Sequence, residues 1–252
     1  MEGHFLTDRG QVRSHNEDSG GIFYNKDNQL IAVIADGMGG HQAGDVASKL
    51  ATDLIRDKWE PQSGLNTSES LESWLSASIS EINQSIYEHS LKNKECKGMG
   101  TTVVIAICTD EFVTVAHVGD SRCYISGENG LKQITEDHSL VNELVRTGQI
   151  TEDDAEQHPR KNVLLKAMGT EQSISEDIKT VEWEKENRLL LCSDGLSNKL
   201  NVEELAAFTQ KPNPLAQIGQ EMIDLANERG GEDNISLILI QHESSSEAGE
   251  NT

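Results

Sequence analysis

Positive charge is scarce in this sequence of 252 residues, which contains 21 lysines and arginines against 43 aspartates and glutamates. The resulting formal net charge of -22 argues against electrostatic binding to nucleic acid or to an anionic membrane surface. Most of these acidic residues are expected on a solvated surface, but a few of them could be gathered around cations.

Targeting and redox signals are also missing. The first ten residues, MEGHFLTDRG, contain neither a basic nor an apolar segment and do not form a secretory signal. No apolar run approaches the roughly 20 residues of a membrane-spanning helix, so membrane insertion is not expected. The four cysteines show no Cys-x-x-Cys spacing, and three lie in apolar runs, where a free thiol behaves as a small hydrophobic group. We therefore expect a reducing, cytoplasmic location.

Short apolar runs rich in β-branched residues predict the strands. These runs cover 20–25, 30–36, 101–108, 112–120, 121–126, 177–184, 188–194 and 234–241. Three of them follow one another closely between 101 and 126, which indicates antiparallel neighbours rather than strand–helix–strand crossovers. Apolar residues at helical spacing predict helices at 46–55, 71–86 and 214–227. The pattern predicts an α+β domain in which helices cover the sheets.

One polar segment, from 136 to 162, interrupts this pattern with only short helical patterns. A long insertion of this kind is either a lid or binding loop, or a passive connection over the surface. Residues 242–252 have little to bury and are expected to form a disordered acidic tail. The remaining 1–241 are expected to form a single domain.

Aspartates stand beside the predicted strands at five places. Three follow a strand, and two directly precede one: Asp36, Asp120, Asp194, Asp18 and Asp233. Each alone could be a common turn residue. Antiparallel strands, however, bring alternate ends to one edge, where clustered carboxylates repel unless cations neutralise them. Two divalent ions would balance about four charges, as in the two-metal hydrolysis of phosphate esters. Oxygen ligands favour Mg²⁺ or Mn²⁺, and Gly37 allows its own carbonyl to approach a metal.

Seven short motifs between Asp8 and Ile240 support the interpretation of these aspartates as a metal site. They are RSHNED, IADGMGGH, GDVAS, GMGTT, VGDSR, LLLCSDGL and GGEDNIS. In this order they resemble the metal-dependent protein serine/threonine phosphatases of the protein phosphatase 2C (PPM) family. The resemblance implies a β-sandwich of two antiparallel sheets with helices on both sides. Residues 138–161 are similar to the flap subdomain of its compact bacterial members, which typically oppose a serine/threonine kinase.

The resemblance also implies a metal set. Asp36 would bridge two divalent cations, Mn²⁺ or Mg²⁺, and Asp194 and Asp233 would complete the protein ligands of the first. The Gly37 carbonyl would bind the second cation, and Asp18 would act mainly through a metal-bound water. A water activated by both cations would attack the phosphorus of phosphoserine or phosphothreonine.

Three further positions match functional residues of the family. Asp120, together with Asp194, matches the pair that binds a weaker third metal in bacterial members. Arg13 matches the arginine that holds the substrate phosphate, a task suited to a planar bidentate cation. His41 matches the proposed general acid that protonates the departing alkoxide. The expected partners are phosphorylated proteins and a cognate kinase, with the phosphatase itself a monomer.

Two other functions compete with this hypothesis. An inactive relative could bind phosphoproteins and shield them, although such a protein commonly lacks one of the metal aspartates, and all are present here. A two-metal hydrolase of small phosphate esters would use the same carboxylates. The flap favours a protein substrate only weakly, because a lid can serve either kind of hydrolase.

Overall fold

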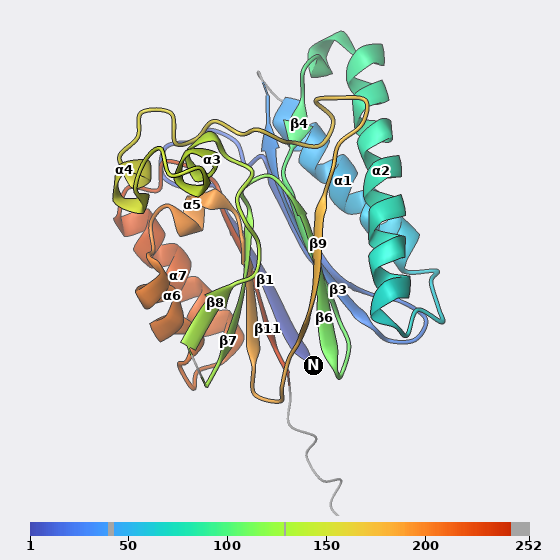
Figure 1. The fold of residues 1–252 in the computed structure, drawn as a ribbon, viewed down its shortest axis with the longest axis vertical. Helices are drawn as coiled ribbons and strands as arrows, with labels where there is room; N and C mark the ends of the chain where they lie inside the picture. Colours follow the sequence, from blue (N-terminus) through green and yellow to red (C-terminus); the bar gives the residue numbers. More distant parts are fainter. Residues whose placement is uncertain (40–42, 129, 243–252) are drawn as a thin grey trace, which may run out of the picture.

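The computed structural model describes residues 1–39, 43–128 and 130–242. Two antiparallel β-sheets pack face to face, and helices cover the outer face of each sheet (Figure 1). The predicted α+β sandwich is therefore confirmed. Among the described residues, no helix has both the length and the apolar character needed to cross a membrane.

The first sheet has five strands. In spatial order they are β1 (Glu2–Asp8), β11 (Ile235–Gln241), β10 (Arg188–Cys192), β7 (Arg122–Gly127) and β8 (Gly130–Gln133). The second sheet has the order β2 (Asp18–Tyr24), β3 (Leu30–Met38), β5 (Val103–Cys108), β6 (Phe112–Val118) and β9 (Asp177–Glu182), with β4 (Gly100–Thr101) paired to the end of β3.

Central strands of both sheets are buried on both faces, which explains their continuous apolar runs. In β3, Ile31 and Val33 pack against the helices, while Ala32 and Ile34 face the other sheet. This division follows from the two-residue repeat of a strand. In β11, Ile238 likewise belongs to the core between the sheets. The three apolar layers hold the strand ends in fixed positions.

Helices occupy the two outer layers. The second sheet is covered by α1 (Ala43–Trp59) and α2 (Ser68–Lys92), and the 3-10 helix η1 (Lys94–Cys96) follows α2. The first sheet is covered by α6 (Val202–Thr209) and α7 (Leu215–Glu228), with the short α5 (Asp194–Ser197) at one end. Their apolar faces close the outer cores.

Several elements differ from the sequence prediction. The strand predicted at 30–36 continues to Met38, because its last two residues pair with β4. The strand predicted to end at Asp194 stops at Cys192, since Ser193 is the N-cap residue that precedes α5. The sequence also did not predict the short elements β4, η1 and α5, or β1, β8 and α6. β1 consists mostly of half-buried residues and lies at a sheet edge, where the apolar pattern is weak.

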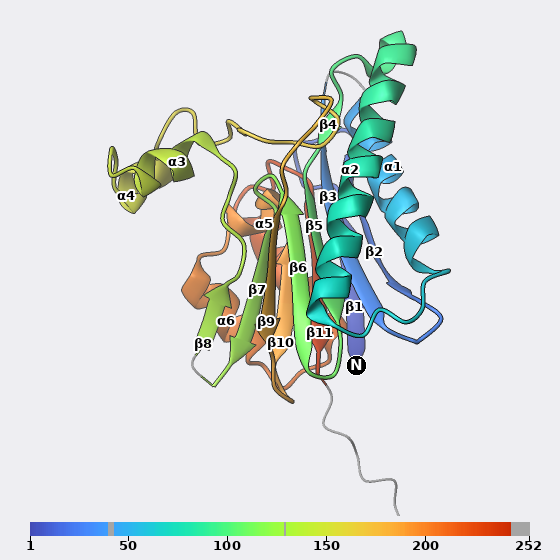
Figure 2. The ribbon, with the colours of Figure 1, turned by 45° about the vertical axis from the view of Figure 1, so that its right-hand side comes forward.

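The predicted flap contains two short helices, α3 (Leu140–Arg146) and α4 (Glu152–Glu156), which project away from the sandwich (Figure 2). Ser139 caps α3 and Thr151 caps α4 through side-chain oxygens that accept backbone N–H groups. The chain returns to the second sheet through residues 163–176. Of the predicted tail, 242–252, only His242 is described; it is buried and its N–H donates to the Asn187 carbonyl at 3.0 Å, so the ordered domain extends one residue further than predicted. Residues 243–252 lie outside the described residues.

Asn83 on α2 anchors this returning segment. Its side chain is 1% exposed, accepts the N–H of Gly169 at 2.7 Å and donates to the carbonyls of Glu171 and Gln172. Asn83→Ala leaves these buried groups without partners and should lower the free energy of unfolding by about 1–3 kcal/mol, measured by urea denaturation. The control Gln84→Ala removes a contact at the helix surface and should change it by less than about 0.5 kcal/mol. Equal effects of the two variants would contradict an anchoring role.

Candidate metal and catalytic site

Five carboxylates meet at one end of the sandwich. Asp18 opens β2 and lies directly opposite Asp36 on β3. Asp120 follows β6, Asp194 opens α5, and Asp233 precedes β11. The negative charges of the other four all act on Asp36. The structure therefore brings the sequence-predicted aspartates together, as the antiparallel arrangement requires.

Burial and mutual repulsion raise the pKa of four of these carboxyl groups, those of Asp36, Asp18, Asp120 and Asp194. Burial, followed by the charges of its acidic neighbours, raises the pKa of Asp36 well above its ordinary value. Burial raises the pKa of Asp18 to about 7, against hydrogen bonds that lower it, and raises that of Asp120 to about 7 with the help of Asp194. The pKa of Asp194 is raised by burial and by Asp233. Bound cations would offset the part of these shifts that comes from repulsion between the carboxylates.

The backbone at Asp36 is held by the GMGTT motif. The Asp36 carbonyl accepts the Thr102 N–H at 2.8 Å and the Thr101 hydroxyl at 2.9 Å. The Asp36 N–H donates to Thr102 Oγ1 at 3.0 Å, and this hydroxyl lies 2.7 Å from Ser121 Oγ. These contacts hold the backbone of Asp36, and none of them uses its carboxylate.

Gly37 is required by crowding as well as by the chemistry predicted for its carbonyl. A Cβ at this position would lie 2.1 Å from the Gly44 carbonyl oxygen on α1 and 2.5 Å from that of Glu17. The Gly37 N–H donates to the same Glu17 oxygen at 3.1 Å. Any side chain here would separate β3 from α1 and from the loop that carries Asp18.

Two carboxylate oxygens in the cluster are left without a hydrogen-bond partner among the described residues, although both are buried. They are Oδ1 of Asp18 and Oδ1 of Asp194. Their other oxygens are fixed, because Asp18 Oδ2 accepts the Ser193 hydroxyl at 2.8 Å and Asp194 Oδ2 accepts the Asn198 amide at 3.0 Å. Buried polar atoms are rarely left unpaired. The donor set, made only of oxygen, fits a hard divalent cation such as Mg²⁺ or Mn²⁺.

Arg13 reaches the edge of the cluster. Its Nη2 lies 2.7 Å from Asp233 Oδ2, and its Nε donates to the Glu232 carbonyl. Burial opposes the charge of Arg13, but Asp233, Glu17 and Asp36 outweigh it and raise its pKa. Its side chain is 48% exposed, so the guanidinium can meet an anion arriving from solvent.

Sequence reasoning missed several residues that build the site. Asn234, 4% exposed, accepts the Glu17 N–H at 2.7 Å and donates to the carbonyls of Arg9 and His15, which fixes the loop that carries Arg13. Its place beside Asp233 in the GGEDN stretch was the available signal. His41, the predicted general acid, lies outside the described residues.

Glu17 was not among the residues predicted for the site. Burial, with Asp45 and Asp233, raises the pKa of its carboxyl group, and Arg13 opposes this shift. Glu17 is therefore a further carboxylate at the edge of the cluster, next to the predicted Asp18.

One known protein family matches most of this chain. The family described as Protein phosphatase 2C matches residues 8–239. The chain belongs to the protein phosphatase 2C family. The serine/threonine phosphatase stp of Listeria monocytogenes serotype 4b (strain F2365) is 47% identical over 243 residues, which cover 96% of each chain. The predicted activity, that of a metal-dependent protein serine/threonine phosphatase, is confirmed.

Solved structures agree with this assignment. The serine/threonine phosphatase Stp1 from Staphylococcus aureus has a TM-score of 0.92 and 42% identity, over 96% of this chain and 95% of that one. The catalytic domain of the phosphatase PstP, solved in complex with two manganese ions, has a TM-score of 0.84 and 30% identity, over 96% and 98%. The prediction of two divalent cations agrees with the second structure.

The flap of this phosphatase is tied to the carboxylate end by an ion pair. Arg122, two residues after Asp120, donates from Nε and Nη2 to the Asp137 carboxylate at distances of 2.7–3.0 Å. Burial opposes the charge of Arg122, but Tyr124 and Asp137 raise its pKa and keep it protonated. Arg122 was not among the residues predicted for the site, yet it fixes the start of the flap.

Metal binding to this phosphatase should release protons near neutral pH. With the pKa of Asp18 and Asp120 raised to about 7, part of these carboxyl groups is protonated in the metal-free protein at pH 7. A cation binds the carboxylate form, so the affinity for Mn²⁺ should rise as the pH rises from 6 to 8. Calorimetric titration at pH 7 in two buffers of different ionisation enthalpy measures the protons released. Identical binding heats in both buffers would contradict this prediction.

Proposed function

We propose that the carboxylate end is the catalytic site and that it removes phosphate from phosphoserine and phosphothreonine in proteins. The observation that carries this proposal is a set of buried, mutually repelling carboxylates with two unpaired oxygens, beside a half-exposed arginine. The carboxylates suit cations, and the arginine suits the phosphate dianion.

The metal ligands are assigned as follows. Asp36, Asp194 and Asp233 would hold one cation, and Asp36 with the Gly37 carbonyl would hold the second, with Asp18 in support. Asp120 and Asp194 would hold a weaker third cation. Bound cations would supply Lewis-acid polarisation of the phosphoryl group and a nucleophile at neutral pH.

Arg13 would orient the substrate phosphate. Its contacts with Asp233 and with the Glu232 carbonyl leave part of the guanidinium exposed, so it can bind two phosphate oxygens with little reorganisation. Glu17 and Asp233 keep Arg13 charged and aimed at the cluster. Protonation of the departing alkoxide by His41 stays a prediction from sequence.

The first test compares the wild type with Asp36→Asn. Asp36→Asn removes the charge that both main cations share, and should lower kcat for a phosphothreonine peptide about a thousandfold or more in Mn²⁺. Phosphate release is measured in EDTA, Mg²⁺ and Mn²⁺. The matched control, Asp224→Asn on the exposed side of α7, should retain wild-type turnover.

Two results would argue against the proposal. Turnover of the wild type in EDTA would remove the need for cations at the carboxylates. Turnover of Asp36→Asn at the wild-type rate would place the reaction elsewhere on the chain.

We further propose that the flap contacts the protein part of the substrate. Val163 and Leu165, two residues apart on the segment that returns from the flap, are 37% and 51% exposed and offer apolar surface to a peptide. Lys161, the last residue of the flap and two residues before Val163, acts electrostatically on Glu232 beside Asp233. This part of the chain is therefore near enough to the carboxylate end to meet residues flanking a phosphothreonine.

The double substitution Val163→Ser and Leu165→Ser should lower kcat/KM for a phosphopeptide about tenfold, because burial of apolar surface by the peptide is lost. Hydrolysis of p-nitrophenyl phosphate, which is too small to reach both side chains, should not change. The control Leu91→Ser alters a residue that is 68% exposed on α2 and should affect neither substrate. Equal losses for both substrates in the double variant would disprove a role in protein recognition.

The remaining predictions concern the substrates, the opposing kinase, the oligomeric state and the cellular location of the phosphatase. The chain acts on phosphorylated proteins, as its family does. We propose that it opposes a serine/threonine kinase, works as a monomer and resides in the cytoplasm. Support for these three points comes from the resemblance to compact bacterial members and from the composition of the sequence.

A further inference from the structure

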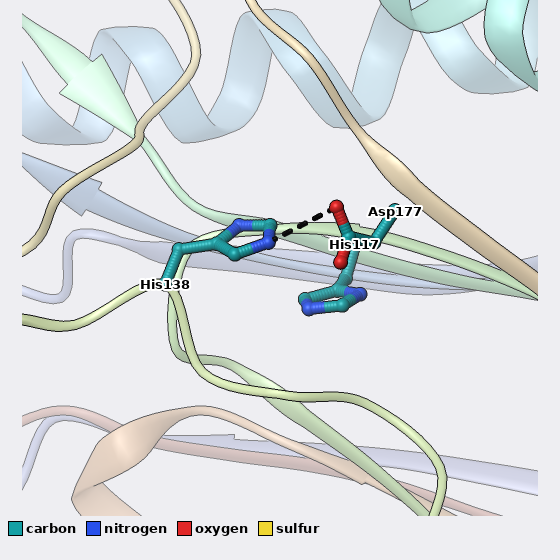
Figure 3. A group of neighbouring side chains, drawn as sticks. All are labelled: His117, His138 and Asp177. Carbon is teal, nitrogen blue, oxygen red and sulfur yellow. Dashed lines mark ion pairs between the residues drawn. The ribbon is translucent and has the colours of Figure 1, made fainter. Parts of the chain in front are cut away.

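Two histidines and an aspartate gather outside the carboxylate cluster, at the base of the flap (Figure 3). His117 lies on β6 directly opposite Asp177 on β9. His138 enters from the first residues of the flap, and its ring stacks on that of His117 with 4.6 Å between centroids. The His117 residue and the His138 side chain are only 4% and 9% exposed, respectively. None of the three has a role in the mechanism described above.

Hydrogen bonds define which ring nitrogens carry protons. His117 Nε2 lies 2.7 Å from the Glu136 carbonyl oxygen, which can only accept, so this nitrogen is the donor. His138 Nδ1 accepts the Gly119 N–H at 3.1 Å, so its proton must be on Nε2, which lies 3.3 Å from Asp177 Oδ1. Burial lowers the pKa of both histidines and favours these neutral rings.

A metal ion is the less favoured occupant of this cluster, although three potential ligand atoms lie within 4.8 Å of one another. The two rings are inclined by only 14°, and nearly parallel stacked rings cannot both direct in-plane lone pairs at one ion. The Nε2 of His138 also carries a proton. In addition, Lys166 Nζ lies 3.5 Å from the Asp177 carboxylate and already balances its charge.

We propose that His138 is a positioning residue that holds the corner carrying Asp120. This inference rests on the proposed role of Asp120 as a metal-binding carboxylate. His138 grips both backbone groups of Gly119: its own N–H donates to the Gly119 carbonyl at 2.9 Å, and its Nδ1 accepts the Gly119 N–H. The backbone that leads into Asp120 is thus fixed from the flap side.

The backbone conformation at Gly119 depends on these contacts with His138. Its φ of +108° is reached easily only by glycine, and a Cβ here would lie 2.6 Å from the Thr102 side chain. Thr102 in turn fixes the backbone of Asp36. The corner at Gly119 therefore has no side chain of its own to anchor it, and His138 supplies the missing anchor.

The opposite side of the His138 ring connects to the other end of the flap. Asp177 faces Nε2 of His138 and also Lys166, which stands on the returning segment. The His138 carbonyl accepts the Leu165 N–H at 2.8 Å. Both ends of the flap thus meet at His138, so the position of the flap and that of Asp120 are set together.

Two variants of His138 separate its two contacts. Asparagine places an amide oxygen near the position of Nδ1, where it can accept the Gly119 N–H, but it cannot reach Asp177. Glutamine extends its amide toward the position of Nε2 and Asp177, but offers no acceptor to Gly119. The pair therefore removes one contact each while both keep a polar side chain of similar size.

His138→Gln should weaken the binding of the weakest Mn²⁺ about tenfold, while the tighter sites remain within about threefold of the wild type. His138→Asn should match the wild type at every site. Binding is measured from the electron paramagnetic resonance signal of free Mn²⁺ at constant pH, together with kcat for a phosphothreonine peptide. Asp120→Ala serves as the reference for loss of the weak site, and thermal unfolding verifies that each variant is folded.

The outcomes are distinct. Wild-type Mn²⁺ binding by His138→Gln, or equal losses in both variants, would overturn the positioning role. Absorption bands of Co²⁺ that vanish in His117→Ala would show that the cluster is a metal site instead. An Asp120→Ala protein with an intact weak site would refute the ligand role of Asp120, while an inactive wild type would refute the proposed function itself.

Discussion

Repulsion among buried carboxylates at one end of the β-sandwich is the constraint to which the rest of the structure responds. Asp18 and Asp36 stand directly opposite each other on paired strands, an arrangement that is unfavourable for like charges. Asp120, Asp194 and Asp233 add to the same negative field. Folding nevertheless brings these charges together, and the cations that we propose for this site would offset their repulsion.

The scaffold opposes this repulsion through its backbone. Thr101, at the end of β4, and Thr102, which follows it, hold the backbone of Asp36. Asn234, just before β11, holds the loop that precedes β2. Ser193, before α5, restrains one oxygen of Asp18. Since each restraint arises from a different element, the geometry of the site is a property of the whole sandwich rather than of any one loop.

The sequence allowed site residues next to apolar runs to be predicted, because the ends of antiparallel strands lie together at the edge of a sheet. The five aspartates and the main helices fall in this class. The roles of Asn234 and Ser193 could not be predicted, since a small polar residue beside an aspartate has the pattern of an ordinary turn residue. The group formed by His117, His138 and Asp177 was also hidden, because 60 positions of sequence separate its first and last members and only the pairing of β6 with β9 unites them.

The pairing of β1 with β11 has a consequence for how this enzyme comes into being. β1 is the first strand of the chain and β11 is the last described one, yet they lie side by side along their whole length. During synthesis, the N-terminal strand and the loop with Arg13 must wait for the final strand, and Asp233 arrives just before it. Contacts between such distant positions form slowly. The proposed centre therefore stays incomplete until β11 has been made and has paired with β1, so dephosphorylation begins only after this late pairing.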